Sequence, residues 1–215
     1  MTSRTPRVLL TGFGPFGKSS YNPTQAAVES LASTPGIRTA ILPVDYRVAT
    51  QRIRELIQEH SPDAVVSLGL AEPRSVLTVE RVAINLAEAR IADNAGYQPQ
   101  DAVLADAPSP AAYFSDLPVK GMVQAIDDAG VPSALSYTAG TFVCNAVMYT
   151  ALDATADLPT QAGFIHVPQA TGHETEETTG KSLPQEEINR GVAAAIEYLF
   201  NPTPHEPMGV FGTLQ

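Results

Sequence analysis

The sequence predicts an α/β protein with a mostly parallel sheet, and three observations support this prediction. Short apolar runs alternate with helix-like stretches, which is typical of parallel strands joined by crossover helices on both faces of a sheet. The 215 residues are 44% hydrophobic, enough to fill a sizeable core. No internal repeat divides the chain, so we expect one domain over residues 1–215, with an irregular tail from about residue 201.

Five apolar runs are the expected strands. They are rich in leucine and β-branched residues and end near glycine, proline or polar residues. The runs are Arg7–Phe13, Thr39–Val44, Ala64–Leu70, Ser133–Thr138 and Gly163–Val167.

Helices are expected between and after these strands. Thr24–Ala32 follows Asn22-Pro23, in which asparagine can cap a helix and proline suits its first position. Three further stretches repeat apolar residues at the spacing of one buried helix face, namely Ala49–His60, Val119–Ala129 and Glu186–Leu199. Two segments break the pattern, a long loop at Arg90–Ala107 and a polar, mobile loop at Ala170–Pro184.

Composition argues against several classes of protein. With 13 basic and 23 acidic residues the formal net charge is −10, which disfavours binding to nucleic acids or anionic membranes. No apolar run approaches the roughly 20 residues that cross a bilayer, and Val8-Leu9-Leu10 is too short for a signal peptide. A single cysteine allows neither an internal disulfide nor a thiolate zinc site. We therefore expect a cytoplasmic protein without a metal site.

Four unusual segments lie at the expected strand ends. Because parallel strands end at one edge of a sheet, where ligands bind, we expect these segments to converge. They are Thr11–Gly17, Gly69–Arg74, Thr138–Asn145 and His166–Pro168.

Cys144 stands directly after the turn Thr138–Thr141 and opens a helix-like run. A helix N-terminus and a nearby imidazolium both favour the thiolate, so we predict a Cys144 pKa below the usual 8.5 or so. The N–H groups of the same first turn could hold an oxyanion. The spacing of the apolar residues that follow fits a small buried core residue equally well.

His166 and Glu80 are the candidate partners of this cysteine. Of the four histidines, His166 alone ends an apolar strand, where it suits a general base or a half-buried residue bonded to backbone. Glu80 interrupts an apolar stretch, so it is either exposed beside Arg81 or buried with a hydrogen-bond partner such as an imidazole.

The glycine-rich segment Gly12–Gly17 has two interpretations. Its glycine spacing partly matches a dinucleotide-binding loop, which leaves a nucleoside- or phosphate-binding enzyme as an alternative function. However, Pro15 lacks the N–H that a phosphate would use. Phe13 and Phe16 instead suggest a wall for a flat, uncharged ligand, or side chains that pack the sheet edge.

Together these motifs resemble the pyroglutamyl peptidase I family of cysteine peptidases. The resemblance covers nearly the whole chain. It is carried by Gly12-Phe13-Gly14-Pro15-Phe16-Gly17, Glu80-Arg81-Val82-Ala83-Ile84-Asn85, Ala89-Arg90-Ile91-Ala92-Asp93-Asn94, Ser136-Tyr137-Thr138-Ala139-Gly140-Thr141-Phe142-Val143-Cys144-Asn145 and Phe164-Ile165-His166-Val167-Pro168.

The resemblance implies a three-layer α/β/α sandwich with a twisted, mostly parallel sheet. It implies a peptidase that removes an N-terminal pyroglutamyl (5-oxoprolyl) residue through a thioester, needs no cofactor, and forms a homodimer or homotetramer. Cys144 would be the nucleophile, His166 the general base and then acid, and Glu80 the group that orients His166. Arg90 would assist the oxyanion. The residues implied for the substrate pocket are Phe13, Phe16, Ile91, Phe142 and Val143.

The chain also departs from the family pattern. Glu72 and Pro73 stand where family members often have glycines, Lys18 replaces another glycine, and Gln169–Gly172 replaces an aromatic residue, leucine and proline. If these changes spoiled the pocket, the protein would be a non-catalytic scaffold, which is a further alternative.

Overall fold

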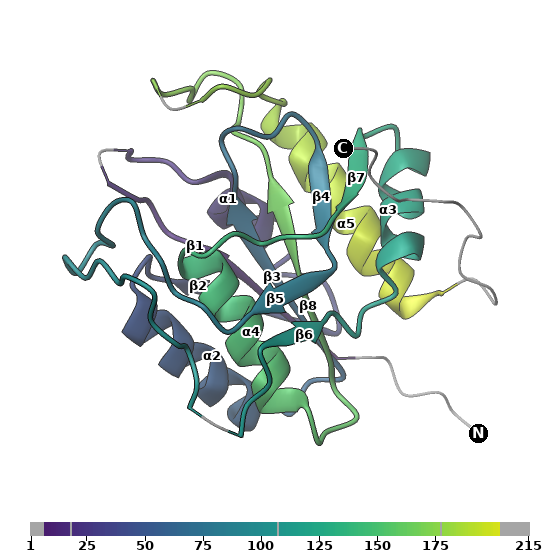
Figure 1. Ribbon diagram of the computed structural model, residues 1–215. Coiled ribbons are helices and arrows are strands. Elements are labelled where there is room, and N and C mark those ends of the chain that lie inside the picture. The colour runs from purple at the N-terminus through teal and green to yellow at the C-terminus, as the bar shows by residue number, and fades with distance from the viewer. Residues whose placement is uncertain (1–6, 18, 107, 177, 203–215) are drawn as a thin grey trace, which may run out of the picture.

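All five predicted strands form, and they lie in one six-stranded sheet (Figure 1). The computed structural model describes residues 7–17, 19–106, 108–176 and 178–202. In spatial order the strands are β2 Ile37–Leu42, β1 Val8–Phe13, β3 Ala64–Leu70, β8 Gln161–Val167, β4 Leu77–Glu80 and β7 Ser133–Ser136.

Strand β4 was not predicted, and it reverses the direction of the sheet. Strands β2, β1, β3 and β8 are parallel to one another, whereas β4 pairs antiparallel with β8 and parallel with β7. The register places Thr78 of β4 opposite His166 of β8. A separate antiparallel pair, β5 Val82–Ile84 and β6 Ala112–Phe114, was also not predicted.

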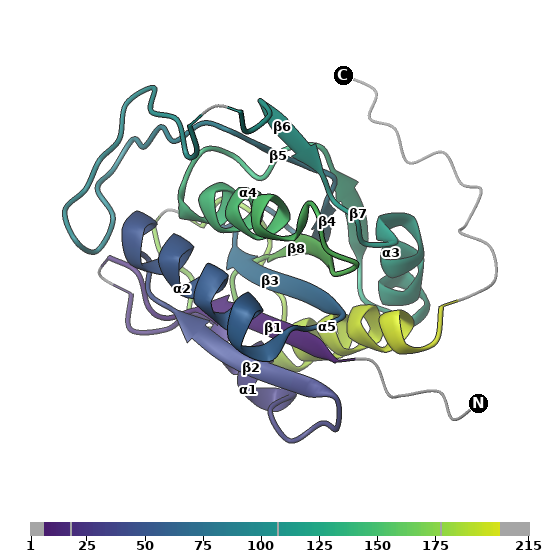
Figure 2. The same cartoon turned by 90° about the horizontal axis from the view of Figure 1, so that it is seen from below.

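Five helices cover both faces of the sheet, as expected for a three-layer sandwich (Figure 2). One face buries a core against α1, α3 and α5, and the opposite face buries a second core against α2 and α4. The bounds are α1 Pro23–Ser30, α2 Tyr46–His60, α3 Val119–Asp128, α4 Val143–Thr155 and α5 Gln185–Phe200.

Helix α1 begins as predicted and holds the glycine-rich turn in place. Asn22 caps it, because its Oδ1 accepts a hydrogen bond from the Thr24 amide at 3.0 Å and its Nδ2 donates to the Gly14 carbonyl at 2.9 Å. Thr24 Oγ1 accepts a hydrogen bond from the Phe13 amide at 2.9 Å. The start of the helix therefore fixes the direction in which the chain leaves β1.

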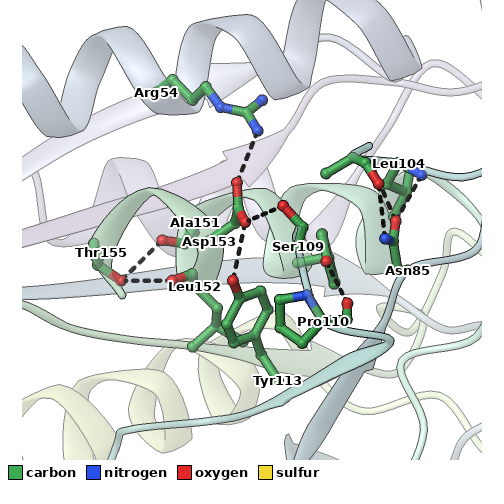
Figure 3. A network of polar contacts seen from close by, with 12 residues as sticks. Arg54, Asn85, Leu104, Ser109, Pro110, Tyr113, Ala151, Leu152, Asp153 and Thr155 are labelled. Atoms are coloured by element: carbon green, nitrogen blue, oxygen red, sulfur yellow. Dashed lines mark hydrogen bonds and ion pairs between the residues drawn. The ribbon is translucent and has the colours of Figure 1, made fainter. Parts of the chain in front are cut away.

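Helix α4 is buried around most of its circumference because helix α2, the central sheet and the β5–β6 pair surround it. Asp153 near its end accepts hydrogen bonds from Ser109 and Tyr113 and pairs with Arg54 of α2 (Figure 3). Tyr149 donates to the Pro110 carbonyl at 2.6 Å. These contacts anchor residues 85–111, the long loop between β5 and β6, part of which lines a cavity at the sheet edge.

Two further predictions concerned membrane-spanning segments and the C-terminal tail. Within the described residues, no helix combines the length and apolar character needed to cross a bilayer. The predicted irregular tail falls mainly at residues 203–215, outside the described part of the chain.

Candidate active site

A cavity of about 990 Å³ opens where β1, β3 and β8 end. All four segments predicted to converge contribute to its walls, and the 85–111 loop adds a fifth side. The lining includes Phe13, Phe16, Leu70–Arg74, Glu88–Ile91, Gln100, Asp101, Thr138–Cys144 and His166.

The predicted convergence is confirmed, but the reason given for one segment was wrong. Strand β7 runs opposite to β8, so its carboxyl end does not lie at the edge where β1, β3 and β8 end. Residues 137–142 instead lead the chain from the end of β7 to the start of α4, which lies at the cavity.

Cys144 is the second residue of α4 and lies over the β3–β8 pair. A Cβ atom built on Gly69 would come within 2.8 Å of the Cys144 Sγ, so this close approach requires glycine at position 69. Gly69 pairs in register with His166, and side chains of registered partners point to the same face of a sheet. The thiol and the imidazole therefore lie on the same face, beside the cavity.

His166 is paired with a fully buried carboxylate from β4. Its Nδ1 lies 2.7 Å from Oε1 of Glu80, and the two side chains are 5% and 0% exposed. An ionised carboxylate only accepts hydrogen bonds, so Nδ1 carries the proton and Nε2 keeps its lone pair. Of the two interpretations of Glu80, the buried one is correct.

Arg74 also contacts Glu80. Its guanidinium donates to Oε1 of Glu80 and to Oγ1 of Thr78, and it donates to the Thr138 carbonyl at 3.0 Å. Burial, the largest single effect, opposes ionisation of Glu80, but the hydrogen bond and charge of His166 and the charge of Arg74 together lower the pKa of the Glu80 carboxyl. Glu80 is therefore an anion at neutral pH.

The pKa predicted for Cys144 has the wrong direction. Burial, followed by the negative charge of Glu80, raises the pKa of the Cys144 thiol to about 12, and the positive charge of Arg74 offsets only part of this. Burial also lowers the pKa of His166, although Glu80 opposes the shift. Thiol and imidazole are therefore both neutral at rest, so the expected imidazolium is not present to favour the thiolate.

Aromatic side chains form one wall of the cavity. Phe142 lies 5.5 Å from Phe16 and 5.4 Å from Tyr46, measured between ring centroids. Phe13 also lines the cavity and is almost fully buried. Val143, the first residue of α4, lines it as well and is fully buried. Ile91 of the 85–111 loop is half exposed on the same cavity. All five residues that the family resemblance implied for the pocket thus line one cavity.

The start of α4 is held by residues that the sequence analysis did not single out. Tyr46 donates its hydroxyl to the Thr141 carbonyl at 2.9 Å. Asn145 accepts from the Ile84 amide and donates to the carbonyls of Ile84 and Leu86, all at 2.9–3.0 Å. Phe142, the cap residue, makes no side-chain cap hydrogen bond, so the first-turn N–H groups of α4 are not engaged by a cap side chain.

The two arginines of the cavity differ in their surroundings. Arg90 lines the cavity but is exposed, and its side chain forms no ion pair among the described residues. Arg74 contacts Glu80 and influences the pKa values of Cys144 and His166. Arg74 could have been recognised from the sequence as a site residue, because it lies in the turn after β3, within the segment Gly69–Arg74 that was expected at the sheet edge.

Two of the departures from the family pattern contact each other. Oε1 of Glu72 accepts hydrogen bonds from Gln169 at 3.2 Å, from Thr175 at 2.8 Å and from Thr178 at 3.2 Å. The Gly180 amide also donates to the Glu72 carbonyl at 3.2 Å. The 170–184 loop is therefore fastened to the turn after β3, and none of its described residues lines the cavity. The third departure, Lys18, lies outside the described residues.

Comparison with known proteins gives consistent matches over most of the chain. The pyrrolidone-carboxylate peptidase of Levilactobacillus brevis is 44% identical over 195 residues, covering 88% of this chain and 95% of that protein. The protein of the same name from Thermococcus kodakarensis is 41% identical over 206 residues, covering 93% and 98%. The crystal structure of Bacillus amyloliquefaciens pyroglutamyl peptidase I matches with a TM-score of 0.83 at 39% identity, covering 88% and 94%.

A thiol at a helix start, on the same sheet face as an imidazole that is paired with a buried carboxylate, is the set of groups that cysteine peptidases use. The sequence model of the family described as pyroglutamyl peptidase matches residues 6–201. The chain belongs to this family, whose members are cysteine peptidases that remove N-terminal pyroglutamate. The predicted family is confirmed, and it replaces the nucleoside- or phosphate-binding alternative.

Proposed function

We propose that Cys144, His166 and Glu80 form the catalytic triad that hydrolyses the bond after an N-terminal pyroglutamyl residue in this protein. The observation that carries the proposal is the buried 2.7 Å contact between His166 and Glu80, beside Cys144 and at the wall of the cavity. A thiol, a base and a group that orients the base are the parts that nucleophilic acyl transfer requires.

The neutral resting state sets the order of proton transfers. Nε2 of His166 takes the proton of Cys144 as Sγ attacks the pyroglutamyl carbonyl carbon, and Glu80 stabilises the imidazolium that forms. His166 then returns this proton to the departing amine, which leaves a thioester on Cys144. A water molecule, deprotonated by His166, then attacks the thioester carbonyl. The C–S bond breaks, pyroglutamate leaves, and the imidazolium returns its proton to the Cys144 sulfur. These steps use protein groups and water alone.

Two groups of this chain suit the negative charge that develops on the carbonyl oxygen. The first-turn N–H groups of α4, including that of Cys144, are not engaged by a cap side chain. Arg90 lines the same cavity and provides a positive charge from the opposite loop. We assign the oxyanion to the amides, with Arg90 assisting.

The cavity walls suit a small lactam. A pyroglutamyl terminus has no ammonium group, so apolar contact with the ring supplies much of the binding. Phe13, Phe16, Phe142 and Val143 form such a surface, and Ile91 closes it from the 85–111 loop. A site that pairs the lactam N–H and C=O would reject proline, because those polar groups would then be left unpaired.

The test is Cys144→Ala, assayed by release of a chromogenic amine from a pyroglutamyl anilide. We expect activity to be abolished while circular dichroism stays native, and thiol alkylation of the unmodified enzyme should inactivate it to the same extent. Exposed Ser33→Ala serves as the matched surface control. Full turnover by the Cys144→Ala protein would disprove the proposed nucleophile.

We also propose that residues 1–215 form one peptidase domain that acts in the cytoplasm as a homodimer or homotetramer. The family match over residues 6–201 supports the single domain, and the family resemblance supports assembly and location. Sedimentation equilibrium of the full chain tests the assembly, and a monomer at micromolar concentration would contradict it. Cell fractionation tests the location.

A further inference from the structure

Arg74 connects three parts of the site that the triad alone does not connect. Its side chain is 23% exposed, and its guanidinium donates to Glu80 and Thr78 on β4 and to the Thr138 carbonyl. Thr138 belongs to residues 137–142, the segment that leads to Cys144 at the start of α4. The Arg74 guanidinium therefore links Glu80 to the backbone segment that leads to Cys144.

Arg74 shares one oxygen of Glu80 with His166. Both bind Oε1, the arginine at 2.5 Å and the imidazole at 2.7 Å. Oε2 has no hydrogen-bond partner of normal geometry among the described residues. Arg74 and His166 thus hold this oxygen, and the Ser136 side chain also stabilises the carboxylate by a hydrogen bond. Among the described residues, Arg74 is the cation paired with Glu80 while the imidazole is neutral.

The turn that carries Arg74 is itself held from outside the cavity. Glu72, two residues earlier, binds Gln169 and the hydroxyls of Thr175 and Thr178. Lys181 donates its amide to Ser75 at 2.8 Å on the other side of the turn. Hydrogen bonds therefore hold the backbone on both sides of Arg74. A fixed backbone keeps the guanidinium in the position from which it makes its three hydrogen bonds.

We propose that Arg74 is a positioning residue for the reaction: it holds Glu80 against His166, moderates the effect of the Glu80 charge on the imidazole, and ties the Thr138 turn to β4. It acts through Glu80 and not by contact with the scissile bond. The proposal rests on the proposed triad, because without a catalytic His166 its position would have no effect on the rate.

The charged and titratable groups that face His166 give the expected pH dependence. They are Glu80 of β4, Arg74 of the turn and Cys144 of α4. Arg74 lowers the pKa of His166, although less than burial does. Removing its charge should therefore raise that pKa, so that the acid limb of the kcat/KM profile, where the neutral base is lost, moves to higher pH.

The experiment compares Arg74→Gln and Arg74→Lys with the control Arg52→Gln on α2, whose side chain is 43% exposed. We expect Arg74→Gln to lower kcat by about 10- to 100-fold, the range for loss of a hydrogen bond to a charged group, and to move the acid limb upward. Arg74→Lys keeps the charge but has one donor nitrogen where the guanidinium uses two, so it cannot occupy both positions that bind Glu80 and the Thr138 carbonyl, and kcat should fall while the acid limb stays in place. Arg52→Gln should change neither.

An Arg74→Gln enzyme with unaltered kcat and acid limb would overturn the proposal. If that variant does not fold, judged by circular dichroism, an Arg74→Lys enzyme with wild-type kcat overturns it instead. Failure of the triad gives a different pattern, because Cys144→Ala or Glu80→Gln would then retain activity. Loss of activity in those two variants with no effect at Arg74 refutes only the role of Arg74.

Discussion

Replacing Glu80 by glutamine removes a charge while keeping the shape of the proposed triad. The amide oxygen can still accept from His166 and Arg74, and the new NH₂ group takes the place of Oε2. The hydrogen bond to His166 therefore persists in a neutral form. What is lost is the negative charge that stabilises the imidazolium formed when Cys144 gives up its proton.

The magnitude follows from the 2.7 Å contact between His166 and Glu80. A hydrogen bond to a charged group contributes about 1.5–3 kcal/mol, against about 0.5–1.5 kcal/mol for a neutral one. Unit charges about 4 Å apart interact by about 4 kcal/mol at an effective dielectric constant of about 20. We therefore expect a loss of roughly 3–4 kcal/mol in the transition state, or about 10²–10³-fold in kcat.

Steady-state hydrolysis of a pyroglutamyl anilide measures this effect across pH, with the exposed Glu59→Gln protein as control. The carboxylate raises the pKa of His166, so its removal should also move the acid limb of kcat/KM to lower pH. A kcat within about threefold of the control would refute the reasoning, since this is below 1 kcal/mol. An acid limb that moves to higher pH would refute it equally.

Three further predictions concern the thiol, the pocket and the fold. Because the Cys144 pKa is raised to about 12, iodoacetamide should alkylate it faster at each step of pH up to 10, and a plateau below pH 8 would indicate a thiolate–imidazolium pair instead. Phe16→Ala should raise KM by about tenfold with little change in kcat, since it removes apolar wall without touching the triad. A methyl group at Gly12 would lie 2.8 Å from the Thr24 carbonyl, so Gly12→Ala should destabilise the fold by about 1–3 kcal/mol, measured as a lower Tm by calorimetry.

The sequence was most informative where local pattern determines structure. Asn22-Pro23 predicted the start of α1, and the apolar stripe of α2 at Ala49, Ile53 and Leu56 is buried as expected. Cys144 and His166 could be proposed from their positions next to expected elements. The rule that parallel strands end at one edge places His166 correctly, but Cys144 reaches that edge only through residues 137–142, because β7 runs opposite to β8.

Features that depend on distant partners were not predictable in this way. Strand β4 has only four residues, and although Leu77, Thr78, Val79 and Glu80 alternate between apolar and polar, all four are buried, so this short alternation does not mark a solvent-facing side. The partner that buries and orients Glu80, His166, lies 86 residues away along the chain. The Cys144 pKa was misjudged for the same reason: the helix start is visible in the sequence, whereas burial and the charge of Glu80 arise from tertiary packing.

The reversed direction of β4 explains how a carboxylate reaches the back of His166. Thr78 lies opposite His166, so Glu80, two residues on, is its diagonal neighbour on the same face. Because β4 runs antiparallel, this diagonal step leads away from the sheet edge and into the interior, where Glu80 is fully buried. In a parallel strand the same step would lead beyond the edge towards solvent. Nδ1 is thus bound from the inside of the sheet, which leaves Nε2 for the cavity side, where Cys144 and the substrate lie.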